Sequence, residues 1–358
     1  MPFTKEIPTT KEQQIDFLLK INREHSAEFS SPDARLARKR YRAQHPTEIG
    51  AFKCMDGRIH IPLATNTPLG IIQPWRNLGG KFNLGWPYFA KDVAGWVEYS
   101  VNKGRDVLIL VTYHYSRGEE HRGCAGYGYD QQMSIAGTLR LKQQVERAFG
   151  KSHKVVYPIL FGFETDIDAV VLHGENGEVI DLSTIEDTSE DSLKTMLGRL
   201  FPDMPERILQ DLLPLVTGNI AHIAEVKNNQ RPLTEVVHRE WVIGLGRGFD
   251  WLHEPNTALL VGPFSPNLHE PVETAASIIK ANMEAGRIGD QSFVLLASAI
   301  FRDSTGVEPL LAKEKALFLR EFAIKTIQNK FPEFANKMHV LPVIVDMNTR
   351  ALTIVEEN

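Results

Sequence analysis

The sequence predicts an α/β fold, a mostly parallel sheet flanked by helices, that is internally duplicated as a pseudo-dimer. Short runs of β-branched and apolar residues alternate with longer segments of helical periodicity, which is the order of a parallel sheet with helical crossovers. The second half then repeats the hydrophobic pattern of the first. A period near half the chain indicates a duplicated domain rather than a solenoid.

The chain begins with a predicted helical arm. Between residues 10 and 48 apolar side chains follow one helical stripe, which is followed by a basic segment at 35–42, and the pattern stops at His45 and Pro46. On a chain of net charge −5, such a basic run is more often a solvated helix face than a nucleic-acid patch, and we interpret it so.

Strands and helices alternate after the arm. Segments dense in apolar and β-branched residues are predicted as buried strands, and segments of helical spacing as the helices between them. Two further short strands around a GlyGluAsnGly turn predict a hairpin. The predicted strands are 49–53, 107–113 and 154–163, the helices are about 89–102 and 133–149, and the hairpin is 168–182.

The same series is expected again in the second half. Two helical segments at about 191–226 correspond to the N-terminal arm, residues 240–249 align with 51–60, and residues 292–302 align with 107–117. We expect the strands of this copy to continue or pair with the first sheet, because pairing would bury an edge that otherwise invites aggregation.

The composition excludes several classes of protein. The chain has 358 residues, of which 42% are hydrophobic and 24% charged, as in a globular protein of two domains. A net charge of −5 is too mild to indicate nucleic acid or an anionic membrane as a partner. The N-terminus lacks the apolar core of a secretory signal, and the longest apolar run is too short to cross a bilayer. We therefore expect a cytoplasmic protein.

Two cysteines point to a metal site. Cys54 ends the first predicted strand, and Cys124 follows His121 in the loop after the next one. Two thiolates and one imidazole suit Zn²⁺, and three protein ligands leave an open position, as in catalytic zinc sites. The strand ends of an open α/β sheet are where ligands bind, so these three residues are the predicted zinc ligands. The alternative is that both cysteines are buried small apolar residues.

Asp56 and Arg58 follow Cys54 directly. They stand two residues apart, so in an extended segment both side chains point the same way and can form a charge-assisted pair. Such a carboxylate can accept a hydrogen bond from zinc-bound water or bind the metal as a fourth ligand. Because zinc lowers the pKa of its water to about 7, these residues predict a hydrolase or hydratase. The alternative is a structural ion pair. His60 and His114 stay outside the predicted site, because a lone histidine beside a strand is more often a satisfied or exposed side chain.

Three motifs resemble the β-class carbonic anhydrases. They are CysMetAspGlyArg at 54–58, ArgAsnLeuGlyGly at 76–80 and HisArgGlyCys at 121–124, and their order and spacing agree with that family over about residues 48–183. The resemblance implies a β-carbonic-anhydrase-like fold, zinc on the three predicted ligands, and the Asp56 and Arg58 pair as the catalytic dyad. The implied reaction is reversible hydration of CO₂ to bicarbonate by a zinc-bound hydroxide.

The glycine-rich loop belongs to the same expected site. It lacks the lysine of a phosphate-binding loop, so we expect its backbone to lie close to the metal. Asn77, Gly79 and Gly80 are accordingly predicted to line the substrate pocket.

One intact copy followed by a copy without metal ligands resembles the carboxysome shell carbonic anhydrases. This layout divides the chain into a helical arm (1–48), a zinc-binding catalytic domain (49–183) and a degenerate repeat (184–358). The chain departs from that subgroup in its shorter N-terminus and its compact His-x-x-Cys spacing. The second-copy residues aligned with Cys54, Asp56, His121 and Cys124 are Ile243, Leu245, Gly306 and Pro309.

The predicted function is zinc-dependent CO₂ hydration. Two alternatives stay open: a related zinc hydrolase acting on CS₂ or COS, and a non-catalytic zinc-bound scaffold or shell protein. The expected partners are CO₂ and bicarbonate, without nucleic acid or membrane, and we expect a homo-oligomer of pseudo-dimers. The resemblance implies association with a carboxysome.

Overall fold

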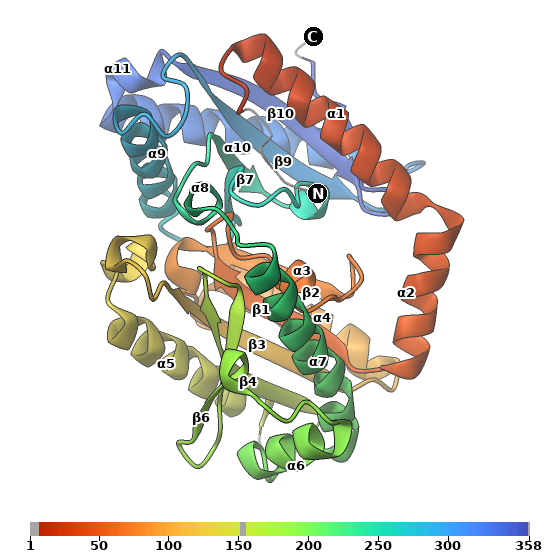
Figure 1. Cartoon of the computed structure of the whole chain (residues 1–358). Helices are drawn as coiled ribbons and strands as arrows, with labels where there is room; N and C mark the ends of the chain where they lie inside the picture. The colour runs from red at the N-terminus through yellow and green to blue at the C-terminus, as the bar shows by residue number, and fades with distance from the viewer. Residues whose placement is uncertain (1–6, 151–154, 357–358) are drawn as a thin grey trace. The chain divides into compact units, whose positions relative to one another are not determined.

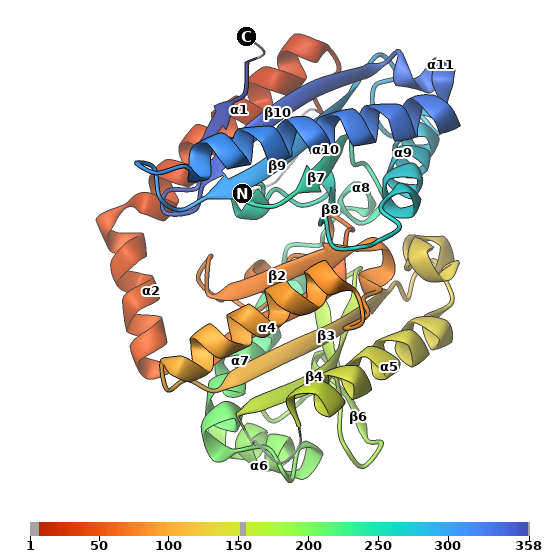
Figure 2. The same cartoon turned by 180° about the vertical axis from the view of Figure 1, so that it is seen from behind.

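The computed structural model describes residues 7–150 and 155–356. The start of the predicted arm and Lys154, the first residue of the predicted third strand, lie outside the described residues. The strands of the described chain form two separate sheets (Figures 1 and 2). No helix in the described part of the chain is long and apolar enough to span a membrane.

The first sheet has the strand order β2-β1-β3-β4-β5-β6. Strands β2, β1, β3 and β4 run parallel, and β5 and β6 add an antiparallel hairpin. The strands are β1 Glu48–Cys54, β2 Ile72–Asn77, β3 Val107–Tyr115, β4 Val156–Glu164, β5 Ala169–His173 and β6 Val179–Asp181.

Two crossover helices cover one face of this sheet (Figure 2). Helix α4 (Pro87–Asn102) buries Phe89, Val93 and Val97, and helix α5 (Gln131–Phe149) buries Leu141 and Val145. These side chains share one core cluster with alternate residues of the central strands, because successive strand side chains point to opposite faces. Strand β3 is buried on both faces, and only its last residue is not fully buried.

The second sheet has the same design. Its order, β11-β10-β9-β7-β8, repeats the order β5-β4-β3-β1-β2 of the first sheet, again with one antiparallel strand at the end. The strands are β7 Val242–Gly246, β8 Ala258–Val261, β9 Phe293–Phe301, β10 Met338–Asp346 and β11 Leu352–Ile354; the helices are α9 His269–Glu284, α10 Glu308–Lys330 and α11 Pro332–Ala335. The predicted α/β fold with internal duplication is confirmed.

The strands of the second half pair only with one another among the described residues, so the expectation that they continue the first sheet is wrong. The edge positions explain this. The first sheet ends on β2 and on the β5–β6 hairpin, and the second ends on β8 and on the short β11. Each copy thus forms a separate sheet, and the short edge strands limit pairing with further strands.

The helical arms are exchanged between the two copies. The remaining helices are α1 Lys11–Ser30, α2 Pro32–Gln44, α3 Ile61–Ala64, α6 Glu190–Leu200, α7 Glu206–Asn228 and α8 Leu233–Val236. Two compact units result: a first-sheet unit, Leu36–Val236 with Phe264–Pro266, and a second-sheet unit that holds the rest of the described chain.

Side-chain hydrogen bonds fasten each helical arm to the sheet of its compact unit. On α1, the Gln14 and Asn22 side-chain amides donate to the carbonyls of Ser292 and Arg350 in the second-sheet unit. On α7, the Asn219 amide donates to the carbonyls of Ala64 and Asp168 in the first-sheet unit. The compact units thus differ from the sequential division at 1–48, 49–183 and 184–358, because each arm packs on the sheet of the other half.

Candidate metal centre and active site

The two cysteines meet at the carboxyl end of the first sheet. Cys54 is the last residue of β1, where it lies opposite Asn77 on β2. Cys124 stands at the start of a short 3-10 turn, and its carbonyl accepts hydrogen bonds from the backbone N–H groups of Tyr127 and Tyr129. Both thiols are buried, with 4% and 2% of their residue surface exposed. The strand end and the folded loop hold both sulfur atoms at one place.

The third member of this group is His114 on β3. The ligand atoms of Cys54, His114 and Cys124 all lie within 4.8 Å of one another. His114 is 2% exposed, and neither of its ring nitrogens has a hydrogen-bond partner among the described residues. A buried polar atom without a partner costs about 1–3 kcal/mol. An unpaired imidazole beside two thiols is the donor set expected of a site that takes a soft or borderline metal such as Zn²⁺.

His121, the histidine predicted as a zinc ligand, does not join this group. It lies on the 3-10 turn Glu120–Arg122 with an exposed side chain, and its ring packs 5.1 Å from the ring of Tyr129. The short spacing to Cys124 favoured His121 in the sequence. The signal for His114 was a histidine near the carboxyl end of an otherwise apolar strand that is buried on both faces.

The two thiols lie close enough to shift each other's pKa in opposite directions. Burial by itself would raise the pKa of the Cys54 thiol, but a hydrogen bond from Cys124 and the nearby His114 hold that pKa well below its usual value. The hydrogen bond to Cys54 raises the pKa of Cys124 well above its usual value, and burial adds to this. The pair therefore favours one thiolate, centred on Cys54, and thiolate is the form that binds metal.

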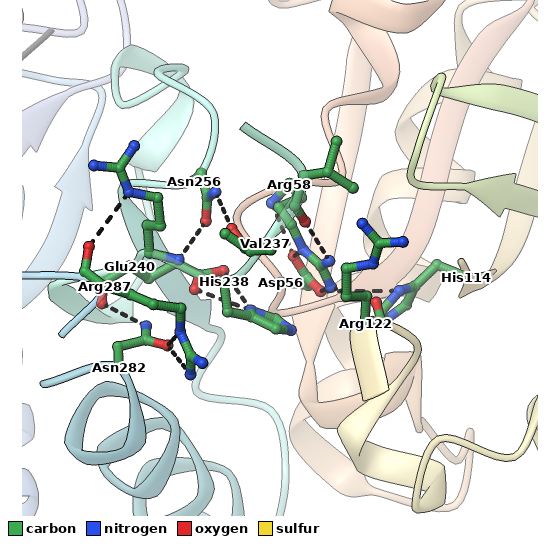
Figure 3. Close-up of polar contacts among 12 residues, drawn as sticks. Asp56, Arg58, His114, Arg122, Val237, His238, Glu240, Asn256, Asn282 and Arg287 are labelled. Carbon is green, nitrogen blue, oxygen red and sulfur yellow. Dashed lines mark hydrogen bonds and ion pairs between the residues drawn. The ribbon is translucent and has the colours of Figure 1, made fainter. Parts of the chain in front are cut away.

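Asp56 and Arg58 form the predicted ion pair next to this group (Figure 3). The Arg58 guanidinium donates from Nε to Asp56 Oδ1 at 3.1 Å and from Nη2 to Asp56 Oδ2 at 2.6 Å, and the Arg58 backbone N–H donates to Oδ1 at 2.8 Å. Both residues are buried, at 3% and 5% exposure. Asp56 Oδ2 lies 3.8 Å from His114 Nδ1, so the carboxylate borders the metal group while its oxygens are held by arginine.

The glycine-rich loop lies against the same strand ends. A Cβ added to Gly80 would come within 3.4 Å of the backbone N of Cys54, and one added to Gly79 would come within 3.1 Å of the Tyr127 ring. The φ angle is +65° at Gly79 and +63° at Gly80, and residues with L side chains rarely adopt such positive values. The Asn77 amide donates to the Lys81 carbonyl, while its buried Oδ1 has no partner among the described residues.

The second sheet carries no such group in its described residues, and its register shows what replaced the histidine. Strands β3 and β9 are both nine residues long and hold the same place in their sheets. Their penultimate residues, His114 and Ile300, pair with the penultimate residues of the next strand, Phe163 and Val345. Ile300 also packs so closely on Gly248 that an added Cβ there would lie 2.6 Å from its Cγ2 atom. An apolar contact thus replaces the imidazole.

The register also corrects the alignment of the first strands. The fifth residue of β3 pairs with Phe52, and the fifth residue of β9 pairs with Leu245, so these two residues are counterparts. Arg247, two residues further on, therefore stands where Cys54 stands in the first copy. The sequence alignment placed Ile243 there, which is four residues too early.

Residues 91–191 match the family model of the carboxysome shell carbonic anhydrase catalytic domain. The match covers less than a third of the chain; it includes His114 and Cys124 but begins after Cys54. No curated protein matches the chain. With His114 in the metal group, nine residues separate the histidine from Cys124, so the compact His-x-x-Cys spacing is not the spacing of the metal group. Over residues 91–191 the chain is therefore similar to the catalytic domain of the carboxysome shell carbonic anhydrases, the group that its duplicated layout resembles.

Proposed function

We propose that the chain is a zinc-dependent carbonic anhydrase that interconverts CO₂ and bicarbonate, with zinc held by Cys54, His114 and Cys124. The observation that carries the proposal is the buried Cys-His-Cys group, whose imidazole has no hydrogen-bond partner in the described part of the chain, directly beside an arginine-bound carboxylate. The matched catalytic-domain family supports the same activity. His114 takes the role that the sequence assigned to His121.

The donor set decides the choice of metal. Two thiolates and one imidazole select zinc over the hard cations Mg²⁺ and Ca²⁺, which prefer oxygen ligands. Three protein ligands leave one position for water or substrate. When bound, zinc acts as a Lewis acid and brings the pKa of a coordinated water to about 7.

Asp56 is the proposed hydrogen-bond acceptor at the edge of the metal group. Its two carboxylate oxygens receive three hydrogen bonds from Arg58, so the side chain is held in one orientation. Because both oxygens are engaged by arginine, we assign Asp56 as a hydrogen-bond acceptor for the reacting water rather than as a fourth metal ligand. Arg58 fixes that orientation and balances the buried negative charge.

The glycine loop keeps bulky side chains away from the reaction. Gly79 and Gly80 bring backbone to the strand ends, and the free Oδ1 of Asn77 supplies a buried acceptor there. We propose that this loop lines the pocket for a small linear molecule. The small size of CO₂ fits a buried site whose loop residues, Gly79 and Gly80, carry no side chains.

A stopped-flow CO₂ hydration assay on protein with measured zinc content tests the proposal. We expect rapid hydration by the wild-type chain and loss of hydration in Cys54→Ser. Turnover of CS₂ or COS without CO₂ hydration would support the related hydrolase instead, and a zinc-loaded but inert chain would support the scaffold.

The matched family is named for the carboxysome shell, and we propose that this chain associates with a carboxysome. Co-purification of the chain with intact carboxysomes tests this, with a soluble marker protein as the control. The homo-oligomer expected from the sequence stays a prediction.

A further inference from the structure

The Arg58 guanidinium is held by more than its carboxylate partner. Besides the two bonds to Asp56, its Nη2 donates to the carbonyl of Arg122 at 2.8 Å (Figure 3). Its Nη1 donates to the carbonyl of Val236 at 2.9 Å. These carbonyls lie on segments far from Arg58 in the sequence. Because the guanidinium is planar with donors in a fixed fork, two such acceptors fix its plane, and with it the orientation of the Asp56 carboxylate.

The Val236 carbonyl needs an external anchor. It ends α8, a helix of four residues, and so short a helix has little stability of its own. Arg231 supplies the anchor just before this helix. Its Nη1 donates to Asp168 Oδ1 at 2.9 Å and its Nη2 donates to Asp168 Oδ2 at 2.5 Å, a two-point ion pair.

Asp168 is itself rigidly held. It ends the tight turn between β4 and β5, is 5% exposed and has a φ angle of +56°. His222 on α7 contacts its Oδ2 at 2.9 Å, and Asn219 on α7 donates to its carbonyl at 2.8 Å. The turn is thus fastened to α7 by side chain and by backbone, and it is a stiff point for Arg231 to hold.

The same turn also supports the other carbonyl that accepts from Arg58. The Arg122 guanidinium lies 3.7 Å from Asp166 Oδ1, and the Asp166 carbonyl accepts a weak 3.5 Å hydrogen bond from Arg231. Both backbone acceptors of Arg58 therefore trace back to one turn, residues 165–168. Side-chain contacts and the backbone of α8 thus connect this turn to the Arg58 guanidinium.

We propose that Arg231 is a positioning residue for the catalytic pair: by holding Asp168 it places the Val236 carbonyl, which aligns Arg58 and thereby Asp56. This inference rests on the proposed function of the Asp56–Arg58 pair. It adds a residue that none of the three motifs contains and that lies in the second half of the chain.

The test compares Arg231→Gln with Arg199→Gln in the full chain. Arg199 on α6 is the control, because it also makes a two-point ion pair, with Glu178 at 3.1 and 2.6 Å, and that pair is more exposed than the Arg231–Asp168 pair. We expect Arg231→Gln to keep its zinc and to lower kcat by roughly tenfold with little change in KM, since a small misplacement of a catalytic group is enough for such a loss. Arg199→Gln should leave kcat unchanged.

A double-mutant comparison shows whether Arg231 acts through Asp56. In an Asp56→Asn background, Arg231→Gln should lower kcat no further, because the group that it positions is already disabled. The same tenfold loss in both backgrounds would overturn the proposal. So would equal effects of the Arg231→Gln and Arg199→Gln substitutions. If Arg231→Gln does not fold, Arg231→Lys keeps the charge but loses the two-point contact, and we expect an intermediate loss.

A readout without activity separates this inference from the proposed function. The backbone N–H of Arg58 donates to Asp56, so its hydrogen exchange reports the order of the pair. In Arg231→Gln, exchange over residues 55–59 should be several-fold faster than in the wild type and in Arg199→Gln. Unchanged exchange there would contradict the inference. A wild-type chain without CO₂ hydration would instead remove the proposed function and leave the exchange result standing.

Discussion

A buried imidazole is costly when its nitrogens have no partner, and this cost marks His114 as a residue kept for a ligand. His114 is 2% exposed, and both of its nitrogens lack a hydrogen-bond partner among the described residues. Removing it should therefore relieve an unpaired group in the metal-free protein while removing a ligand from the metal-loaded protein. His121 has neither property, because its ring is exposed.

The two histidines can be separated by zinc content. We expect His114→Ala to lose most of its zinc, since two thiols alone leave the site short of a ligand. His121→Ala should retain one zinc per chain and near wild-type activity, which makes it the matched control. Elemental analysis after gel filtration measures both. Zinc retained in His114→Ala but lost in His121→Ala would return the ligand to the position that the sequence motif indicated.

Asp56 can be tested apart from the metal. Asp56→Asn preserves the size of the side chain but replaces one acceptor oxygen with a donor group. We expect unchanged zinc content and a kcat/KM lower by roughly 10²-fold, the scale of losing a positioned proton acceptor. Arg58→Gln should do similar damage and also lower thermal stability, because it leaves the buried Asp56 carboxylate without its cation. Full CO₂ hydration by Asp56→Asn would contradict the role assigned to the carboxylate.

The sequence allowed most of this site to be predicted. Cys54, Cys124, Asp56 and Arg58 are brought together because motif spacing and strand ends are local features. His114 was missed because its partners, Cys54 and Cys124, come from two other segments, and its place in an apolar strand was not enough to separate it from a satisfied histidine. Arg231 could not be found at all, since only the docking of α7 brings it to the first sheet.

At the scale of elements, the buried strands were the most predictable and the edge strand the least. Strands β3 and β4 are nearly continuous apolar runs, as parallel strands covered on both faces must be. Strand β2, which reads IleGlnProTrpArgAsn, is not among the strands that the sequence predicts. Its position at the sheet edge explains how Pro74 is tolerated, because one side of an edge strand needs no ladder hydrogen bonds.

Because Asp168 fastens α7, we expect the free energy of unfolding to fall at acidic pH. Burial by itself would raise the Asp168 pKa, but hydrogen bonds from His222 and Arg231 and the charges of both lower it below its usual value. A lowered folded-state pKa means that the folded chain binds fewer protons than the unfolded chain. The resulting stability is fully present above the unfolded pKa of about 3.9 and is lost as the pH falls through the folded value.

Urea unfolding at neutral and acidic pH tests this contribution. Asp168→Asn should be clearly less stable than wild type at pH 7, and this difference should begin to shrink as the pH falls below about 4, because the unfolded wild-type chain then takes up a proton at Asp168 that the folded carboxylate does not yet bind. Asp191→Asn, a change at an exposed aspartate on α6, serves as the control and should follow the wild-type curve. A stability difference that stays constant down to pH 3 would show that the Asp168 charge does not fasten α7.

At the scale of the whole molecule, each sheet depends on a helical arm from the other half of the chain. Helix α1 buries Leu18 and Ile21 and contacts β9, whereas α7 contacts β5. Figure 1 shows α1 over the second sheet and α7 over the first, on the faces opposite to α10 and α4 in Figure 2. The sequence allowed the two repeats to be predicted. The exchange of arms could not be predicted, because both arms have the same kind of apolar stripe. No local sequence feature indicates on which sheet an arm packs.

This exchange predicts how fragments of the chain behave. A fragment of residues 1–183 keeps every motif residue but lacks α7 and Arg231, so the buried N–H of Val170 and carbonyls of Ala64 and Asp168 lose their partner Asn219. Each unpaired buried group costs about 1–3 kcal/mol, and the apolar face of α1 is left without its sheet.

We therefore expect the 1–183 fragment to be insoluble or to self-associate, with little bound zinc. A fragment of residues 36–236 has a similar length, omits α1 and keeps α6 to α8 with the first sheet. It should be the more soluble of the two and should bind more zinc, although it lacks Phe264, which packs on Phe82 and Phe89. Sedimentation velocity and zinc analysis of both fragments make the comparison. A monomeric, zinc-loaded 1–183 fragment would show that the first sheet does not need the arm of the second half, and the exchanged arms would then be dispensable for the catalytic unit.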